Sequence, residues 1–319
     1  MKTKNLITGL GAAALLLAGG LAAGGTASAA TADGVDVHHV PQLSSGPVEW
    51  SADRMRSAVP ADALVADKVA AAEAEGGASS TSTDVATGAP SAVDGVAVPR
   101  AAAADPESPV PTIGKVFFTL GGTDYVCSGN SVASSNGSTV STAGHCLNEG
   151  PGTFASNWVF VPAYENGSAP YGQWAATELI APTQWSRSGD ITYDTGFAVV
   201  SGGTGQSLSS TVGASGVAFN QARGQSYTAY GYPAAAPFTG QTLQSCAGTA
   251  TADPFGQSQS QGIPCDMTGG SSGGPWFTGG GSAGVQNSVN SFGYDSVADT
   301  MFGPYWGSVI QSAYTEAAG

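Results

Sequence analysis

Short apolar or alternating runs recur from Thr112 onward, and Gly, Asn, Ser or Pro residues separate them. Val, Phe, Tyr and Thr dominate these runs, and no helical periodicity accompanies them. Such runs are typical of β-strands, and short strands at regular spacing favour a β-sandwich or β-barrel. We therefore predict strands at residues 114–120, 138–141, 157–161, 177–180, 196–200, 216–219 and 227–230.

The pattern changes at both ends of the chain. Near the C-terminus, Val309, Ile310 and Tyr314 lie roughly one helical turn apart, which predicts a helix over 307–317. At the N-terminus, two lysines precede an apolar stretch over 6–21, and a small-residue Ala-Ser-Ala site comes next at 27–29. This order is typical of a secretory signal peptide, predicted over residues 1–29. We expect a secreted, extracellular protein without a membrane partner once the signal is removed.

Residues 30–111 differ in composition from residues 112–319. They are rich in Ala, Asp and Glu, contain no cysteine, and hold almost no aromatic residue beyond Trp50. One short helix is predicted at 61–75, and 81–91 is of low complexity. So little apolar bulk cannot form a core of its own. The segment is either a removable pro-segment with its linker or a disordered spacer, and we favour the first, with Arg100 as a processing point.

Composition narrows the class of protein. Only 10% of the residues are charged, 47 are glycines and the net charge is −14, which suits an all-β secreted protein. Without a basic patch to neutralise phosphates, nucleic acid is excluded as a partner. Residues 112–319 are numerous enough to bury a substantial core.

Four cysteines, Cys127, Cys146, Cys246 and Cys265, would form disulfides in an oxidising compartment. They allow three connectivities, of which the sequential one closes two loops of equal span. The alternative, a zinc site, is disfavoured because no C-x-x-C pair exists and only His145 lies near a cysteine. We predict no metal and no cofactor.

The segment CDMTGGSSGGPWF, residues 265–277, holds two adjacent serines between glycines. A nucleophilic serine needs such a turn, because nearby backbone N–H groups must point at the developing oxyanion. A flexible Gly/Ser linker, as at 279–281, is the competing interpretation. His145 is the only histidine after residue 39, and it could serve as a general base. Asp194, at the start of an apolar strand, is the best carboxylate to orient it, and Asp190 is the alternative.

The order histidine, aspartate, serine discriminates between hydrolase architectures. GGSSG also matches the nucleophile elbow of α/β-hydrolases, in which the histidine follows the serine. No histidine follows His145, so that architecture is excluded.

STAGHC and GGSSGGP resemble the histidine and serine motifs of the trypsin-like, chymotrypsin-fold serine endopeptidases. TYDTGFAVV resembles the aspartate segment of their secreted bacterial, glutamyl-endopeptidase-like branch, which favours Asp194 over Asp190. The resemblance covers roughly residues 112–310. It implies an all-β fold of two packed six-stranded antiparallel β-barrels with a short C-terminal helix, and a catalytic cleft between the barrels. It assigns residues 112–319 to the protease domain.

The resemblance also implies residue roles. Ser272 would be the nucleophile, His145 the general base and then acid, and Asp194 its orienting partner. The N–H groups of Gly270 and Ser272 would form the oxyanion hole. Cys127–Cys146 would close the loop carrying the histidine, with Cys246–Cys265 as the second disulfide. Ser271 stands where animal relatives carry an aspartate that pairs with a newly freed N-terminus, so that activation route is not expected.

The resemblance places the substrate pocket at Asp266, Asn290, Ser291 and Gly293. Glutamate-selective relatives carry a histidine at the position of Asn290, and trypsin-type enzymes carry an aspartate at that of Asp266. The sequence leaves open whether the preferred side chain is basic, acidic or of another type. The sequence thus predicts a secreted serine endopeptidase, made as a zymogen, that acts through an acyl-enzyme. We expect a monomer whose partners are protein or peptide substrates and its own pro-segment. The alternative is a catalytically silent binding protein with this fold, although no triad residue is missing.

Overall fold

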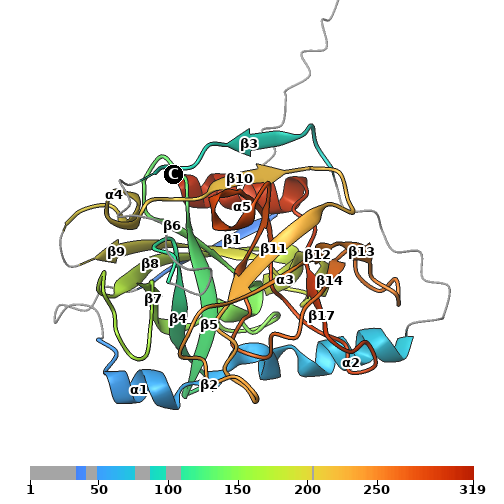
Figure 1. Cartoon of the computed structure of the whole chain (residues 1–319), viewed down its shortest axis with the longest axis horizontal. Helices are drawn as coiled ribbons and strands as arrows, with labels where there is room; N and C mark the ends of the chain where they lie inside the picture. Colours follow the sequence, from blue (N-terminus) through green and yellow to red (C-terminus); the bar gives the residue numbers. More distant parts are fainter. Residues whose placement is uncertain (1–33, 41–48, 76–86, 98–108, 203–204) are drawn as a thin grey trace, which may run out of the picture. The chain divides into compact units, whose positions relative to one another are not determined.

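Six antiparallel strands close into a barrel in the first half of residues 112–319, the domain of the short apolar runs (Figure 1). The computed structural model describes residues 34–40, 49–75, 87–97, 109–202 and 205–319, all within the unit Ala32–Gly319. The predicted signal peptide and Arg100 lie outside the described residues. The barrel strands are β4 (Ile113–Leu120), β5 (Thr123–Val132), β6 (Thr139–Thr142), β7 (Ser156–Pro162), β8 (Trp174–Pro182) and β9 (Gly196–Gly202). Pairing of β8 with both β7 and β9 closes the ring.

Strand β4 is apolar on both faces because both faces are buried. Val116, Phe118 and Leu120 point to one buried cluster, which includes Cys127 and Trp158. The alternate residue Phe117 belongs to another cluster. Successive side chains of a strand point to opposite faces, so a strand covered on both sides shows a nearly continuous apolar run.

The second half of the domain contains two sheets. One has the order β12-β11-β15-β16-β10-β3 and the other β13-β14-β17. Their strands are β10 (Gly216–Phe219), β11 (Ser226–Gly231), β12 (Gln244–Thr249), β13 (Thr251–Ala252), β14 (Gln261–Pro264), β15 (Pro275–Thr278), β16 (Val285–Val289) and β17 (Thr300–Gly303), joined by β3 (Ser91–Val93) from the N-terminal segment. Strands β10 and β16 run parallel, unlike the all-antiparallel expectation, and the other edge of β10 pairs antiparallel with β3.

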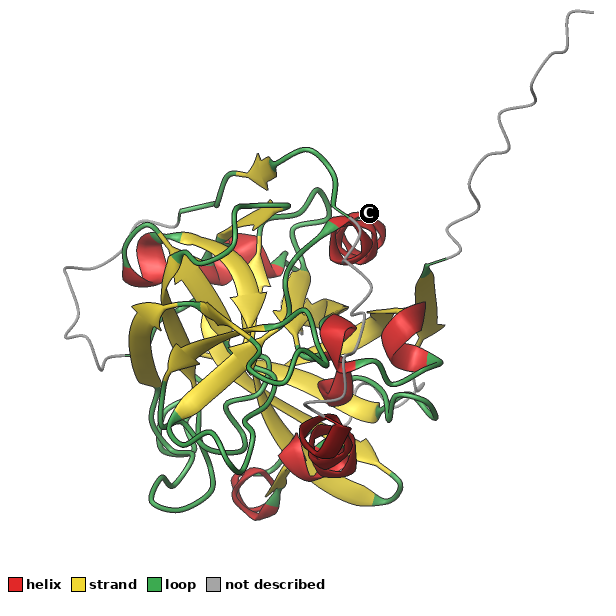
Figure 2. Cartoon of the chain, turned by 90° about the vertical axis from the view of Figure 1, so that its right-hand side faces the viewer, coloured by secondary structure: helices red, strands yellow, loops and turns green. Residues whose placement is uncertain are grey.

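Helices are few and lie outside the sheets (Figure 2). Helix α5 (Ser308–Ala318) confirms the predicted C-terminal helix, and α3 (Thr183–Ser186) and α4 (Leu208–Val212) are short. The buried residues of α5 are Ile310, Ala313, Tyr314 and Ala317. This i, i+3, i+4, i+7 spacing makes one apolar stripe, which packs with Phe197, Phe219 and Trp306. The all-β prediction with a barrel and a terminal helix is therefore confirmed.

The described parts of residues 34–97 pack against residues 112–319. Their elements are β1 (Val35–His39), α1 (Ala52–Ser57), β2 (Val59–Pro60), the 3-10 turn η1 (Ala61–Leu64), α2 (Ala66–Glu75) and β3. The predicted helix over 61–75 is thus interrupted at Val65. Their buried side chains, Trp50, Met55, Ala61, Val65 and Val69, join clusters of the domain. The segment therefore uses the apolar surface of the domain as its core, which does not fit a disordered spacer.

Candidate active site

His145 and Asp194 meet because their turns adjoin the same ends of neighbouring strands. His145 lies in the 3-10 turn η2 (Gly144–Cys146) after β6, and Asp194 follows η3 (Ile191–Tyr193) before β9. Thr142 of β6 pairs with Gly196 of β9. Nδ1 of His145 lies 2.7 Å from Oδ2 of Asp194, and both side chains are fully buried. The other ring nitrogen, Nε2, is buried and has no hydrogen-bond partner among the described residues.

Two further contacts fix this pair. The backbone N–H of His145 donates to Oδ1 of Asp194 at 2.8 Å. A Cβ at residue 144 would collide with Trp185 and approach Oδ1 of Asp194 at 2.9 Å, so glycine is required there. The alternative carboxylate, Asp190, is exposed and caps η3 by accepting from the N–H of Thr192 at 2.9 Å.

Ser291 is a third partner of Asp194. Its Oγ donates to Oδ2 of Asp194 at 2.5 Å, and its side chain is buried. The sequence placed Ser291 only in the substrate pocket. The geometry adds that it orients the carboxylate, a role for which the local sequence carries no signal.

The serine loop connects β14 to β15 and is shaped by its glycines. Gly270 and Gly273 have φ values of +94° and +82°, which L-residues with a Cβ rarely adopt. A Cβ at Gly273 would also collide with Oγ1 of Thr142 and the carbonyl oxygen of Ser128. The loop is thereby held against the end of β6, beside the histidine turn.

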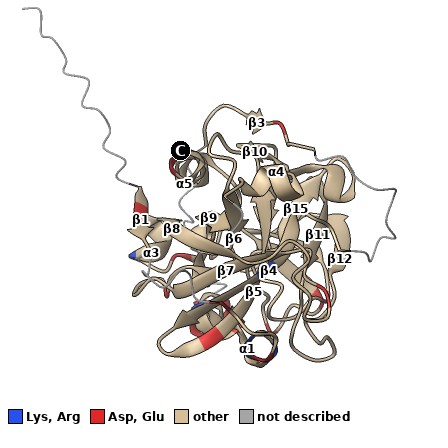
Figure 3. Ribbon diagram, turned by 90° about the vertical axis from the view of Figure 1, so that its left-hand side faces the viewer, with Lys and Arg blue, Asp and Glu red and all other residues tan. Residues whose placement is uncertain are grey.

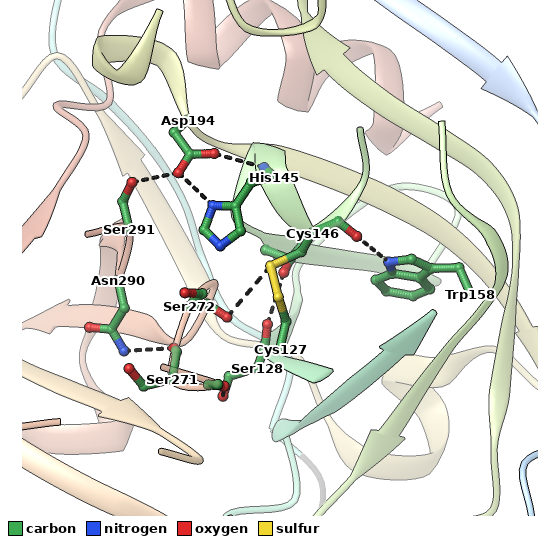
Figure 4. Close-up of a disulfide and its surroundings, with 12 residues drawn as sticks. Cys127, Ser128, His145, Cys146, Trp158, Asp194, Ser271, Ser272, Asn290 and Ser291 are labelled. Carbon is green, nitrogen blue, oxygen red and sulfur yellow. Dashed lines mark hydrogen bonds and ion pairs between the residues drawn. A yellow bond between two sulfur atoms is a disulfide. The ribbon is translucent and has the colours of Figure 1, made fainter. Parts of the chain in front are cut away.

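The two adjacent serines are not equivalent. The hydroxyl of Ser271 donates to the carbonyl oxygen of Thr268 at 2.8 Å. The hydroxyl of Ser272 makes no hydrogen bond with a described residue, and the imidazole of His145 lies between Asp194 and Ser272 (Figure 4). The backbone of Ser272 is fixed, because its carbonyl oxygen accepts from the N–H of Ser128 at 2.7 Å.

Two backbone N–H groups of the serine loop have no hydrogen-bond acceptor among the residues that the structure describes. Within the described residues, neither the Gly270 N–H nor the Ser272 N–H donates to a protein acceptor. Buried or half-buried N–H groups are nearly always paired in folded proteins. Two unpaired donors next to a serine hydroxyl are the arrangement that an oxyanion requires.

Both predicted disulfides, Cys127–Cys146 and Cys246–Cys265, are present. The first lies beside the site, with Sγ of Cys146 3.8 Å from the carbonyl oxygen of Ser272. Cys127, Cys146 and His145 lie close enough together to suggest a metal site. Their sulfurs are joined to each other, however, so the thiolates that bind zinc are not available.

A cavity of about 430 Å³ lies beside Ser272. Three of the four predicted pocket residues, Asp266, Ser291 and Gly293, line it. Asn290 does not: its side chain is buried and bonds to the carbonyl oxygens of Tyr230 and Ser271 and to the indole of Trp276. Asn290 therefore links the serine loop to strand β11 through these hydrogen bonds and does not contact the cavity. No signal in the sequence indicated that residues before position 98 would also line the cavity, among them Asp62, Val65, Val69 and Glu73.

Charged residues make up 10% of the chain, and the ribbon in Figure 3 shows their positions scattered along the described elements. Among the described helices, none is long and apolar enough to cross a bilayer.

The chain resembles known serine protease structures in both sequence and fold. No family model matches the chain. It is 65% identical to the protease Anisep from Arthrobacter nicotinovorans, with a TM-score of 0.65, and covers 97% of that structure with 66% of its own length. It is 57% identical to the thermostable serine protease AL20 from an extremophilic microorganism, with a TM-score of 0.64 and the same coverage. A Glu endopeptidase, 19% identical with a TM-score of 0.52, covers 71% of the chain and shares the fold.

A shorter match links the chain to a protein called extracellular metalloprotease from Bacillus subtilis. The two are 33% identical over 84 residues, only 26% of each chain. The longer matches decide the class. The chain belongs to the chymotrypsin-fold serine proteases, and its fold is that of their glutamyl-endopeptidase-like branch.

Proposed function

We propose that the protein is a secreted serine endopeptidase that acts through Ser272, His145 and Asp194 and is made as a zymogen. The observation that carries the proposal is the buried His145–Asp194 bond beside an unbonded Ser272 hydroxyl. A base held in one tautomer by a carboxylate, next to a free hydroxyl, is the arrangement for nucleophilic catalysis.

In the acylation step, Oγ of Ser272 attacks the carbonyl carbon of the scissile bond while Nε2 of His145 accepts the hydroxyl proton. Asp194 stabilises the imidazolium that forms. The resulting oxyanion is bound by the N–H groups of Gly270 and Ser272, and loss of one such donor typically costs about 10²–10³ in rate. Nε2–H then protonates the leaving amine. Water attacks the acyl-enzyme by the same proton path and regenerates Ser272.

The cavity bears on substrate preference. Its lining contains Asp266, Asp295 and Asp299 from the protease domain and no Lys, Arg or His. A glutamate side chain of a substrate would find no opposite charge there, and burying an unpaired carboxylate is costly. We therefore infer that glutamate is disfavoured next to the scissile bond, although the chain shares its fold with a Glu endopeptidase.

The extent of the matched region and the two disulfides support the proposal that the protein is secreted and made as a zymogen. Both serine protease structures match only 66% of this chain, so about a third of it has no counterpart in either. That share is close in size to residues 1–111, the predicted signal peptide and pro-segment. The two disulfides are consistent with an oxidising, extracellular compartment.

The proposal is tested by expressing the full chain with its signal and assaying the secreted product on an unfolded protein such as reduced casein. We expect new peptide N-termini from the wild-type protein and a mature chain that begins between residues 100 and 113. A secreted product that begins at Ala30 and cleaves casein would refute the zymogen. A processed product that cleaves nothing between pH 5 and 10 would refute the enzyme.

A further inference from the structure

A short turn of the N-terminal segment packs against the turn that carries the proposed catalytic histidine. Ala61, the first residue of η1, is fully buried in one cluster with the Cys127–Cys146 disulfide. The turn contacts η2, which carries His145. Nε2 of His145 is buried and has no hydrogen-bond partner in the described part of the chain. A general base must reach substrate and water, so this covered state is not the working state of the site.

The next residue reaches the serine loop. A Cβ built on Gly269 would overlap the carboxylate of Asp62, so this side chain lies directly against the backbone just before Gly270. Asp62 lines the same cavity as Ser272. The segment thus occupies the space in which a scissile bond would lie.

Helix α2 then covers the pocket side of the cleft. Val65 and Val69 belong to one buried cluster with Phe292 and Tyr294. The helix is also held by polar contacts at both ends. Nζ of Lys68 donates to the carbonyl oxygen of Glu149 at 3.3 Å, and the N–H of Ser296 donates to Glu73 at 2.9 Å.

The chemistry of the site sets the direction of a substrate. The leaving amine must lie next to Nε2 of His145, which protonates it. The disulfide of the next residue, Cys146, lies beside His145 and Ser272 (Figure 4). The acyl part carries its side chain in the cavity lined by Ser291 and Gly293. The acyl part precedes the scissile bond in sequence, so a substrate runs from the pocket side toward the disulfide side.

The N-terminal segment runs the other way. Val59 and Pro60 pair with Tyr125 and Val126 of β5, directly before Cys127. Ala61 lies at the disulfide, Asp62 at Gly269, and Val65 and Val69 at the pocket side. From its N-terminal end onward, the segment therefore passes from the leaving-group side to the acyl side.

We propose that residues 59–69 are an intramolecular inhibitor that fills the catalytic cleft in the direction opposite to a substrate. A reversed peptide bond places its nitrogen where a substrate has its carbonyl carbon, so Oγ of Ser272 has no carbonyl carbon in position to attack and is not acylated by the segment. The segment can block the site without being cut there, and activation requires cleavage elsewhere followed by release. This inference rests on the proposed function, because the cleft is a catalytic one only if Ser272 is the nucleophile.

The direction is tested by cysteine pairs in the full chain carrying Ser272→Ala, which prevents self-cleavage. The pair Val59→Cys with Tyr125→Cys joins register partners of neighbouring strands, within the Cα range that a disulfide spans. The pair Val69→Cys with Tyr125→Cys tests the opposite direction. If residues 59–69 ran as a substrate does, position 69 and not position 59 would lie beside Tyr125. We expect a cross-link for the first pair only, identified by peptide mapping against the two native disulfides. A cross-link for the second pair alone, or for neither, would overturn the proposal, whatever the role of Ser272.

Inhibition is tested by the rate at which a fluorophosphonate labels the uncut full chain, separated from the processed form on a gel. We expect the uncut band to be labelled at least about tenfold more slowly than the processed band. Val69→Asp should raise labelling of the uncut band about tenfold or more, because burial of that valine contributes to docking. Ala74→Asp, on an exposed position of the same helix, is the matched control and should change nothing.

The outcomes separate the two claims. Labelling of neither band would mean that the proposed function fails, while the cross-link result still reports the direction. Equal labelling of both bands, or no effect of Val69→Asp, would mean that the enzyme is correct and the inhibitor is not.

Discussion

Oγ of Ser291 donates a 2.5 Å hydrogen bond to Oδ2 of Asp194, the same oxygen that accepts from Nδ1 of His145. Ser291 thus links the predicted pocket to the orienting carboxylate. One side chain from the second half of the domain fixes a carboxylate that belongs to the first-half barrel.

Ser291→Ala should lower kcat by about 10- to 100-fold, because a hydrogen bond to a charged group contributes about 1.5–3 kcal/mol. The effect should fall mainly on kcat, since the lost bond supports the imidazolium rather than substrate binding. Steady-state kinetics on a short peptide substrate measure both constants. A purely structural role predicts an unchanged kcat per folded molecule, with only the free energy of unfolding reduced.

The two disulfides provide a matched pair of variants, because both close loops with a sequence separation of 19. In the chain-entropy model, each should contribute about 3 kcal/mol to the free energy of unfolding. Replacing Cys127 and Cys146 with alanine should in addition lower kcat, because that disulfide carries the histidine turn. The double alanine variant of Cys246 and Cys265 should lose stability alone. Equal kcat losses in both variants would contradict a positioning role for the first disulfide.

Lys115 predicts a measurable pH dependence of stability. Its side chain is 2% exposed, its Nζ donates to the carbonyl oxygen of Gly240 at 2.8 Å, and burial lowers its pKa to about 7. In the unfolded chain the lysine keeps its proton until about pH 10.4. Between these values unfolding takes up a proton, so the free energy of unfolding should rise with pH. The penalty for burying the charge is largest below pH 7 and disappears toward pH 10.4.

Lys115→Met should remove this rise, which amounts to at most about 1.4 kcal/mol per pH unit. Urea unfolding of both proteins at several pH values from 7 to 9.5 measures the difference in slope. Parallel stability curves for the two proteins would show that Lys115 keeps an ordinary pKa. Other groups, such as the buried tyrosines, are shared by both proteins and cancel in this comparison.

Much of the fold was predictable because the strand signals are local. The runs at 114–120, 157–161 and 196–200 correspond to β4, β7 and β9. Strand β5 was missed because its sequence, TDYVCSGNSV, mixes Ser, Gly and Asn with its apolar residues, yet its last seven residues are buried. Its burial comes from the barrel that closes around it, and a single segment does not reveal its neighbours.

The candidate site was predictable as far as its residues lie in motifs. His145, Asp194 and Ser272 were assigned to one site because they lie in the motifs STAGHC, TYDTGFAVV and GGSSGGP. Asn290 was placed in the pocket by the resemblance, but its side chain bonds to the carbonyl oxygen of Ser271 and does not line the cavity. A position in the sequence does not say which way a side chain points.

The N-terminal segment shows the limit of compositional reasoning. It holds too few apolar residues to form its own core, and Val65 and Val69 are buried in a cluster whose other fully buried members all come from the second part of the chain, among them Trp185 and Phe292. The sequence predicted one short helix over 61–75, but not what it packs against. The surface that receives it is assembled from several loops, and no local signal describes such a surface.

The proposed mechanism depends most on Ser272 as the nucleophile. The direct measurement is to treat the processed wild-type protein with a fluorophosphonate and to identify the modified residue by peptide mass spectrometry. We predict modification of Ser272, none in Ser272→Ala, and full modification in Ser271→Ala, whose lost hydroxyl bonds only to Thr268. Modification of Ser272→Ala at the wild-type rate, or of Ser271 in the wild-type protein, would contradict the central claim.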